Sequence, residues 1–220
     1  RAGNALNNFT LIDKKRYLID QYFDAARNNN VNRIKALAQY ELINPNITDP
    51  ENGFTALHYA AREDAPLAIW YLIAAGANPL QGSASGWTPL DLAVINNHYK
   101  SVEMLLSETR AGYTAEALKR AELNTKDEAM KKLLHASPAI ILQWRTFHRY
   151  VFSIRNQEPV DSLFMEDITP FLSFNTIAIP VSLLTVAVLV NNMDAAVALL
   201  NKGAPVNDKM GAGYTALMYA

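Results

Sequence analysis

The residues of this sequence that could carry catalysis or bind a metal are four histidines and a group of carboxylates. The histidines are His58, His98, His135 and His148. The carboxylates are Glu158, Asp161, Glu166 and Asp167. No histidine lies four residues from another, so the helical pair that binds zinc in many metalloenzymes is missing. We predict no metal site; an active site that joins His148 to the carboxylates is kept as an alternative.

Two other kinds of chemistry lack the motif that they need. Residues 82–86 have the glycine spacing of a nucleophile elbow, but Ala84 stands at the centre, where that motif has serine. No Gly-x-x-x-x-Gly-Lys loop or glycine fingerprint opens a helix, which argues against nucleotide binding. We therefore predict that this chain is not an enzyme and holds no small-molecule cofactor.

Composition narrows the class of protein further. A net charge of -1 and a pI near 6.5 leave no excess of basic residues, so nucleic acid is not expected as a partner. With no cysteine there is no disulfide framework, which suits a reducing compartment. The apolar stretch at 177–190 is shorter than the roughly 20 residues that a membrane span needs, and Pro180 interrupts it. We expect no membrane span.

The strongest signal is an internal repeat. The run Gly-Phe-Thr-Ala-Leu-His-Tyr-Ala-Ala at 53–61 recurs as Gly-Trp-Thr-Pro-Leu-Asp-Leu-Ala-Val at 86–94, and again at 213–220. The first two copies are 33 residues apart. After the first two copies comes an apolar stripe typical of a second amphipathic helix. In the first, Gly76 and Pro79 then favour a helix end.

This repeat resembles the ankyrin family, whose Thr-Pro-Leu-His-x-Ala signature is matched at 55–60 and 88–93 with single changes. The resemblance implies an all-α solenoid of helix-turn-helix repeats with short β-hairpin fingers. Thr55 and Thr88 fit helix caps, and Pro89 fits a first helical position. The resemblance also gives His58 a structural role in a hydrogen-bond network between repeats. Because Asp91 stands at the next equivalent position, we expect that network to be incomplete.

Five segments follow from the period. We predict a degenerate repeat within 1–48, two well-matched repeats at 49–107, a degenerate repeat at 108–136 with helices near 114–122 and 126–135, a helical insertion at 137–175, and further repeats at 176–220, the last incomplete. Within the insertion, 140–152 favours a helix with Trp144, Phe147 and Tyr150 near one face.

The binding surface implied by the resemblance has two parts. At the finger tips, an aromatic residue precedes each capping threonine; these are Phe54, Trp87 and Tyr214, with Glu51 and Asn52 beside the first. At the ends of the first helices, facing the concave groove, are Arg62, Glu63, Ile95 and Asn96. The corresponding pair Leu189 and Val190 is apolar, so we expect the insertion or a partner to cover it.

The function that these patterns favour is recognition of a partner protein. The alternative is that the repeats are the targeting or regulatory portion of a multidomain enzyme, for instance a host-directed bacterial effector. The chain begins at Arg1 with no signal pattern, as expected of a piece of a longer protein. We expect it in the cytoplasm, either of its own cell or of a host cell into which it is secreted.

Overall fold

The computed structural model describes residues 11–109, 112–160, 167–172, 174, 176–179, 181–207, 215 and 218. The chain divides into two compact units, Arg1–Ala136 (unit 1) and Ser137–Ala220 (unit 2). All regular elements in the described residues are helices, in agreement with the predicted all-α class. None of these helices is long and apolar enough to cross a membrane.

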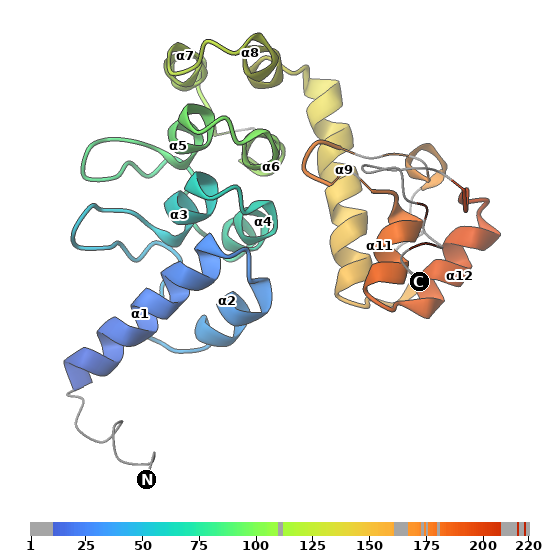
Figure 1. Ribbon diagram of the computed structural model, residues 1–220, viewed down its shortest axis with the longest axis horizontal. Helices are drawn as coiled ribbons and strands as arrows, with labels where there is room; N and C mark the ends of the chain where they lie inside the picture. The colour runs from blue at the N-terminus through green and yellow to red at the C-terminus, as the bar shows by residue number, and fades with distance from the viewer. Residues whose placement is uncertain are drawn as a thin grey trace. The chain divides into compact units, whose positions relative to one another are not determined.

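Unit 1 is a stack of helix pairs. The pairs are α1 (Leu11–Arg27) with α2 (Val31–Leu37), α3 (Ala56–Arg62) with α4 (Pro66–Ala74), α5 (Pro89–Ile95) with α6 (Tyr99–Thr109), and α7 (Ala115–Leu123) with α8 (Glu128–Leu134). The first helices of successive pairs pack on one another, and so do the second helices, which gives two layers (Figure 1). This is the arrangement of a helical solenoid.

Threonine caps fix where the first helices begin. The side chains of Thr55, Thr88 and Thr114 each accept a hydrogen bond from a backbone N–H in the first turn of α3, α5 and α7. Pro66 and Pro89 occupy the first turn of α4 and α5, where a missing N–H breaks no helical bond. The caps predicted from the sequence at Thr55 and Thr88 are thus present.

Turns inside the first helix pairs also link neighbouring pairs. Asn29, Asp64 and Asn97 have positive φ angles of 54°, 52° and 55°, a conformation that asparagine and aspartate tolerate better than most residues. The side-chain oxygen of Asn29 accepts the N–H of Ala68 at 2.9 Å. Asp64 accepts the N–H of Ser101 at 3.1 Å in the same way. In the α1–α2 and α3–α4 turns, one polar residue therefore sets both the turn and the stacking register.

The core of unit 1 is apolar and lies between the two layers. Its largest fully buried side chains are Tyr22, Ile34, Leu57, Tyr59, Ile69, Leu72, Leu90, Met104, Leu105, Met130 and Leu134. They come from every helix pair of the unit, so each pair completes its core only against its neighbours. This mutual burial holds together helices that are as short as seven residues.

Two fingers project from the stack between α2 and α3 and between α4 and α5 (Figure 1). Each is closed by a backbone hydrogen bond, from Asp49 to Phe54 and from Ser83 to Trp87, both 2.8 Å. The described residues hold no β-strand, so these fingers are turns rather than the β-hairpins that the family resemblance implies. Gly53 has φ 72°, and a Cβ there would lie 2.5 Å from the backbone nitrogen of Ala84. Only glycine fits this position.

Unit 2 contains α9 (Pro138–Arg155), the short helix η2 (Thr169–Phe171), α11 (Leu183–Leu189) and α12 (Met193–Asn201). Helix α9 packs against α11, and α11 against α12. Phe147 is fully buried, and its ring meets that of Phe174 edge-on at 5.3 Å. Trp144 is only half-buried. The helix predicted around 140–152 is therefore present as part of α9.

The turn after α9 has the geometry of the turns in unit 1. Gln157 has φ 54°, as does Asn191 between α11 and α12. Asn192 donates to the carbonyl of Ile154 at 2.9 Å, and His98 in unit 1 contacts the carbonyl of Ala61 from the equivalent position. The segment predicted as an insertion thus stacks on α11 through a repeat-type contact.

The apolar pair at the end of α11 is not fully covered. The side chain of Leu189 is 52% exposed, although α9 packs against this helix, and Val190 is half-buried. The expectation that the insertion covers this pair is wrong for Leu189. The buried residues of α11 include Leu183, Leu184 and Ala187, and this helix packs against both α9 and α12.

Candidate functional site

The finger that precedes α3 places an aromatic ring against the start of that helix. Phe54 is half-buried, and its ring stacks on the imidazole of His58 at 5.3 Å and 20°. The same ring meets Tyr59 edge-on at 5.3 Å. Asn52 holds the finger in shape, since its side chain accepts the N–H of Phe54 at 2.7 Å and donates to the Tyr59 hydroxyl at 3.0 Å. The ring of Phe54 is therefore fixed rather than free.

The second finger tip lies next to the first. Trp87 is 37% exposed, and its carbonyl oxygen contacts Nε2 of His58 at 3.0 Å. The N–H of Ala84 donates to the carbonyl of Asn52 at 3.0 Å, which joins the two fingers directly. The structure thus brings the predicted residues Phe54, Trp87 and Asn52 together.

Arginines border these aromatic rings. The guanidinium carbon of Arg62 lies 5.7 Å from the ring centre of Phe54 and 5.1 Å from that of Tyr59. Arg27, the last residue of α1, approaches the Tyr59 ring more closely, at 3.8 Å. These are cation–π distances. Burial raises the pKa of Tyr59, and its hydroxyl donates to Asp49, so this ring stays neutral at physiological pH.

The other predicted residues of this surface lie at its edges. Glu63 pairs with Arg62 at 2.9 Å, and Glu51 lies 3.6 Å from Arg16 in an exposed pair. Ile95, 42% exposed, ends α5 at the position that Arg62 has in α3.

Asn96 is also exposed, and its side chain donates to the carbonyl of Leu92 at 2.8 Å. Tyr214 lies outside the described residues.

Two buried polar links join successive repeats beneath the fingers. In the His58 link, His58 contacts its capping residue Thr55 at 2.8 Å and the carbonyl of Trp87. In the Asp91 link, Asp91 accepts from its capping residue Thr88 at 2.6 Å and from Arg120 at 2.7 Å.

Asp91 is 1% exposed, so its charge is matched by an arginine of the following helix pair. The expectation that the network is incomplete is wrong at Asp91, because Arg120 continues the network there.

Sequence reasoning missed three members of this region: Arg27, Tyr59 and Arg120. One signal was present, since Arg27 and Arg62 both end the first helix of a pair, 35 residues apart. No sequence signal pointed to Arg120. Its role depends on Asp91, which stands where the family has histidine.

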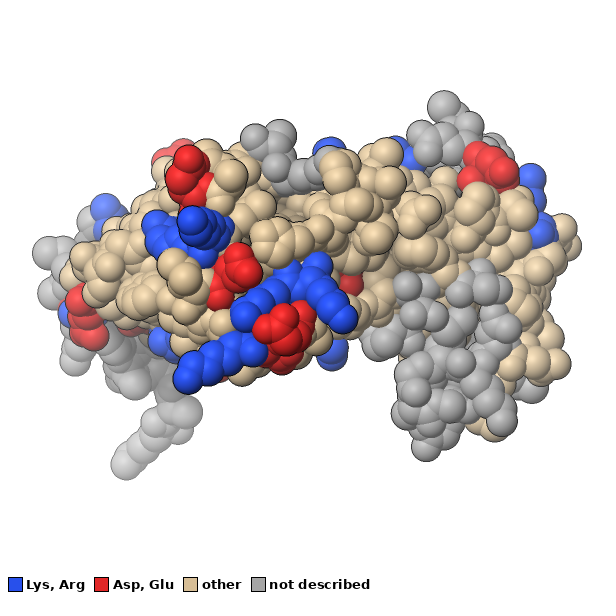
Figure 2. Space-filling view, turned by 90° about the horizontal axis from the view of Figure 1, so that it is seen from above, with Lys and Arg blue, Asp and Glu red and all other residues tan. Residues whose placement is uncertain are grey.

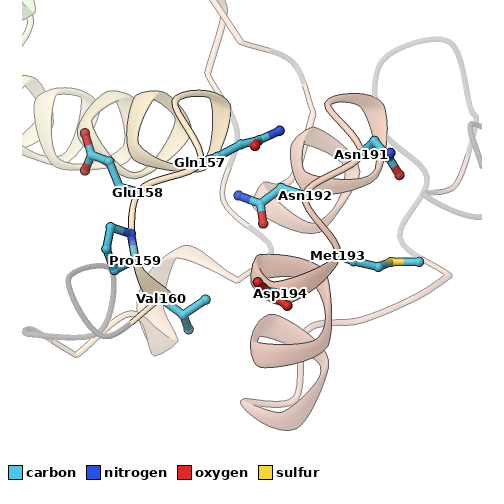
Figure 3. A pocket seen from close by; sticks show the side chains of 8 residues that line it. All are labelled: Gln157, Glu158, Pro159, Val160, Asn191, Asn192, Met193 and Asp194. Carbon is cyan, nitrogen blue, oxygen red and sulfur yellow. The ribbon is translucent and has the colours of Figure 1, made fainter.

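The active-site alternative gains no support from the described residues. His148 is fully buried on α9, whereas Glu158 and Asp167 are exposed. A pocket of about 340 Å³ in unit 2 is lined by Glu158 and the turn at 191–194, and His148 is absent from its lining (Figure 3). Asp161 and Glu166 lie outside the described residues. Within the described part, no group of three or more His, Asp and Glu could hold a metal.

Charge on the α7–α8 end of unit 1 is mixed rather than of one sign. Seen from this end, Lys and Arg side chains alternate with Asp and Glu (Figure 2). Mixed charge does not provide the continuous basic surface that a nucleic-acid backbone needs.

Comparison with known families agrees with this geometry. A sequence model of ankyrin repeats, in three copies, matches residues 22–117. A comparison with curated proteins finds no similar sequence. The matched segment runs from α1 into α7 and includes both fingers, the His58 link and Asp91, whereas Arg120 lies just beyond it. Residues 22–117 of this chain are therefore ankyrin repeats.

Proposed function

We propose that this chain binds a partner protein through a finger surface formed by Phe54, Trp87, Arg62 and Ile95. Ankyrin repeats are generally protein–protein interaction modules, a fold without catalytic function of its own. The observation that carries the proposal is the joining of two aromatic finger tips above a buried hydrogen-bond network, with an arginine against one of them.

Rigidity is what makes these side chains suitable for binding. Phe54 is held by His58 and Asn52. Its side chain therefore loses little conformational entropy when a partner binds. Aromatic residues and arginine are also the types most enriched among the residues that dominate binding energy at interfaces. The exposed Ile95 adds apolar area at the end of the neighbouring helix.

The same surface serves if the repeats are the targeting portion of a larger enzyme, because targeting also works through protein binding. In that case the proposal concerns the repeats and leaves the chemistry to another domain.

The test compares proteins captured from a cell lysate by the wild-type chain and by Phe54→Ala/Trp87→Ala. Truncating two such residues is expected to weaken a specific partner by about 30-fold or more, which corresponds to roughly 2 kcal/mol. Tyr40→Ala serves as the control, since Tyr40 is 50% exposed and lies just after α2, before the turn that Asp49 and Phe54 close. Circular dichroism checks that each variant is folded.

Specific binding lost in the double variant and kept in the control supports the finger surface. A partner retained equally by all three proteins contradicts it and directs the search to another face of the chain.

A further inference from the structure

Arg62 lies against two aromatic rings at the first finger. Its guanidinium carbon is 5.1 Å from the ring centre of Tyr59 and 5.7 Å from that of Phe54. The side chain is nevertheless 37% exposed. An arginine that contacts aromatic rings has lost part of its rotamer freedom before a partner arrives, so binding through it costs less conformational entropy.

Most of the hydrogen-bond donors of Arg62 are uncommitted. Its Nε donates to the carboxylate of Glu63 at 2.9 Å, whereas Nη1 and Nη2 make no hydrogen bond to any residue that the structure describes. Glu63 is the next residue in the chain and its side chain is 43% exposed, so this ion pair adds little to stability. The end of the guanidinium fork is therefore available to an acceptor from outside the chain.

The preceding helix pair shows what an arginine at this position binds. Arg27 ends α1 as Arg62 ends α3, and its guanidinium carbon lies 3.8 Å from the centre of the same Tyr59 ring. Arg27 also pairs with the carboxylate of Asp24, three residues before it in the same helix. The residue three before Arg62 is Tyr59, so α3 supplies no carboxylate at that place. Arg27 thus has a ring and a carboxylate from its own helix, whereas Arg62 has rings and only the exposed Glu63.

Apolar surface lies on the helix next to this arginine. Ile95 ends α5 at the position that Arg62 has in α3, and these two helices pack against each other. The side chain of Ile95 is 42% exposed. This part of the finger surface therefore combines a bidentate donor for an acid with apolar area for its neighbours.

We propose that Arg62 selects partners that present an aspartate or glutamate next to apolar residues, with the partner's carboxylate bound by Nη1 and Nη2 of Arg62. Arginine holds a carboxylate through two parallel N–H···O hydrogen bonds, a geometry that lysine does not reproduce. The apolar neighbours of that acid pack on Ile95 and Phe54. This inference rests on the proposed function, because it names the chemistry of the partner that the finger surface binds.

The probe is a phage-displayed library of random peptides, selected for binding to the wild-type chain. Synthetic copies of the selected peptides are titrated by fluorescence polarisation against the wild type, Arg62→Met, Arg62→Lys and Phe54→Ala/Trp87→Ala. Arg145→Met is the matched control, since Arg145 is an exposed arginine on α9. Each acidic residue of a peptide is also replaced by its amide, which removes the charge without altering the protein.

We expect the selected peptides to contain an acidic residue whose replacement by the amide weakens binding to the wild-type chain at least about tenfold. The same replacement should change binding to Arg62→Met by less than about twofold, because the arginine that the acid would bind is absent. Arg62→Lys should bind the acidic peptide more weakly than the wild type does, and Arg145→Met should bind it as tightly as the wild type.

Two results overturn this inference and leave the proposed function intact. One is a set of peptides that lose binding in Phe54→Ala/Trp87→Ala but tolerate replacement of every acid. The other is an acid whose replacement has the same effect in the wild type and in Arg62→Met. Peptides that bind Phe54→Ala/Trp87→Ala as tightly as the wild type, or a library that yields no binder, contradict the proposed function and this inference together.

Discussion

The His58 link and the Asp91 link occupy the same place in neighbouring repeats but use different chemistry. His58 reaches the backbone carbonyl of Trp87 in the next repeat. Asp91 reaches the side chain of Arg120, which comes from the helix pair after it. Burial lowers the pKa of His58, so the first link is neutral near pH 7, whereas the second joins a carboxylate to a guanidinium.

This difference determines how far each link depends on sequence. Every residue at position 87 has a carbonyl, so the His58 link survives any side chain there. The Asp91 link exists only while position 120 carries a cation of suitable reach. A buried carboxylate without its partner is strongly unfavourable, so the two residues are expected to depend on each other.

The largest effect is expected from Asp91→Ala. This change removes the hydrogen bonds from the backbone N–H and the hydroxyl of Thr88 together with the ion pair to Arg120. The loss of a cap and of a buried network should lower the free energy of unfolding of unit 1 by about 3 kcal/mol. Urea denaturation followed by circular dichroism measures it. Glu116→Ala, an exposed acidic residue on α7, should change stability by less than about 0.5 kcal/mol.

A smaller effect is expected from Arg120→Met, which keeps the apolar stem and removes the charge. The guanidinium is half exposed, so screening reduces the loss to about 1–2 kcal/mol. The double-mutant cycle with Asp91→Asn isolates the link itself: Arg120→Met should be clearly less harmful once the carboxylate is gone. Additive effects of the two changes would show that the buried carboxylate does not depend on its arginine.

The helices of the repeats were predictable because their signals are local. A threonine cap, a proline in the first turn and an apolar period act within one helix, and α3, α5, α7 and α8 are found near the predicted positions. The positions of Phe54 and Trp87 in the fingers were predictable for the same reason, because each residue immediately precedes its cap.

What the sequence did not reveal depends on contacts between repeats. Arg120 is 29 residues from Asp91, and nothing near either residue indicates the pair. Arg27 contacts Tyr59 across 32 positions of the chain. Leu189 was expected to be covered, but which side of α11 meets α9 follows from packing in three dimensions and not from the residue types at its end.

The smallest expected effect on stability is the pH dependence that His58 contributes. Measuring it tests whether the His58 link is neutral, in contrast to the charged Asp91 link. The folded-state pKa of His58 lies below the ordinary value of 6.5, so the unfolded chain binds the proton more readily. The stabilising contribution is therefore complete above about pH 6.5 and is lost as the pH falls below it.

Urea midpoints measured from pH 7.5 to pH 5 should show a decline that is shallower in His58→Asn. His135→Asn, which alters an exposed histidine, should leave that decline in place. An identical decline in wild type and His58→Asn would mean that the imidazole titrates alike in both states and is not held neutral by burial.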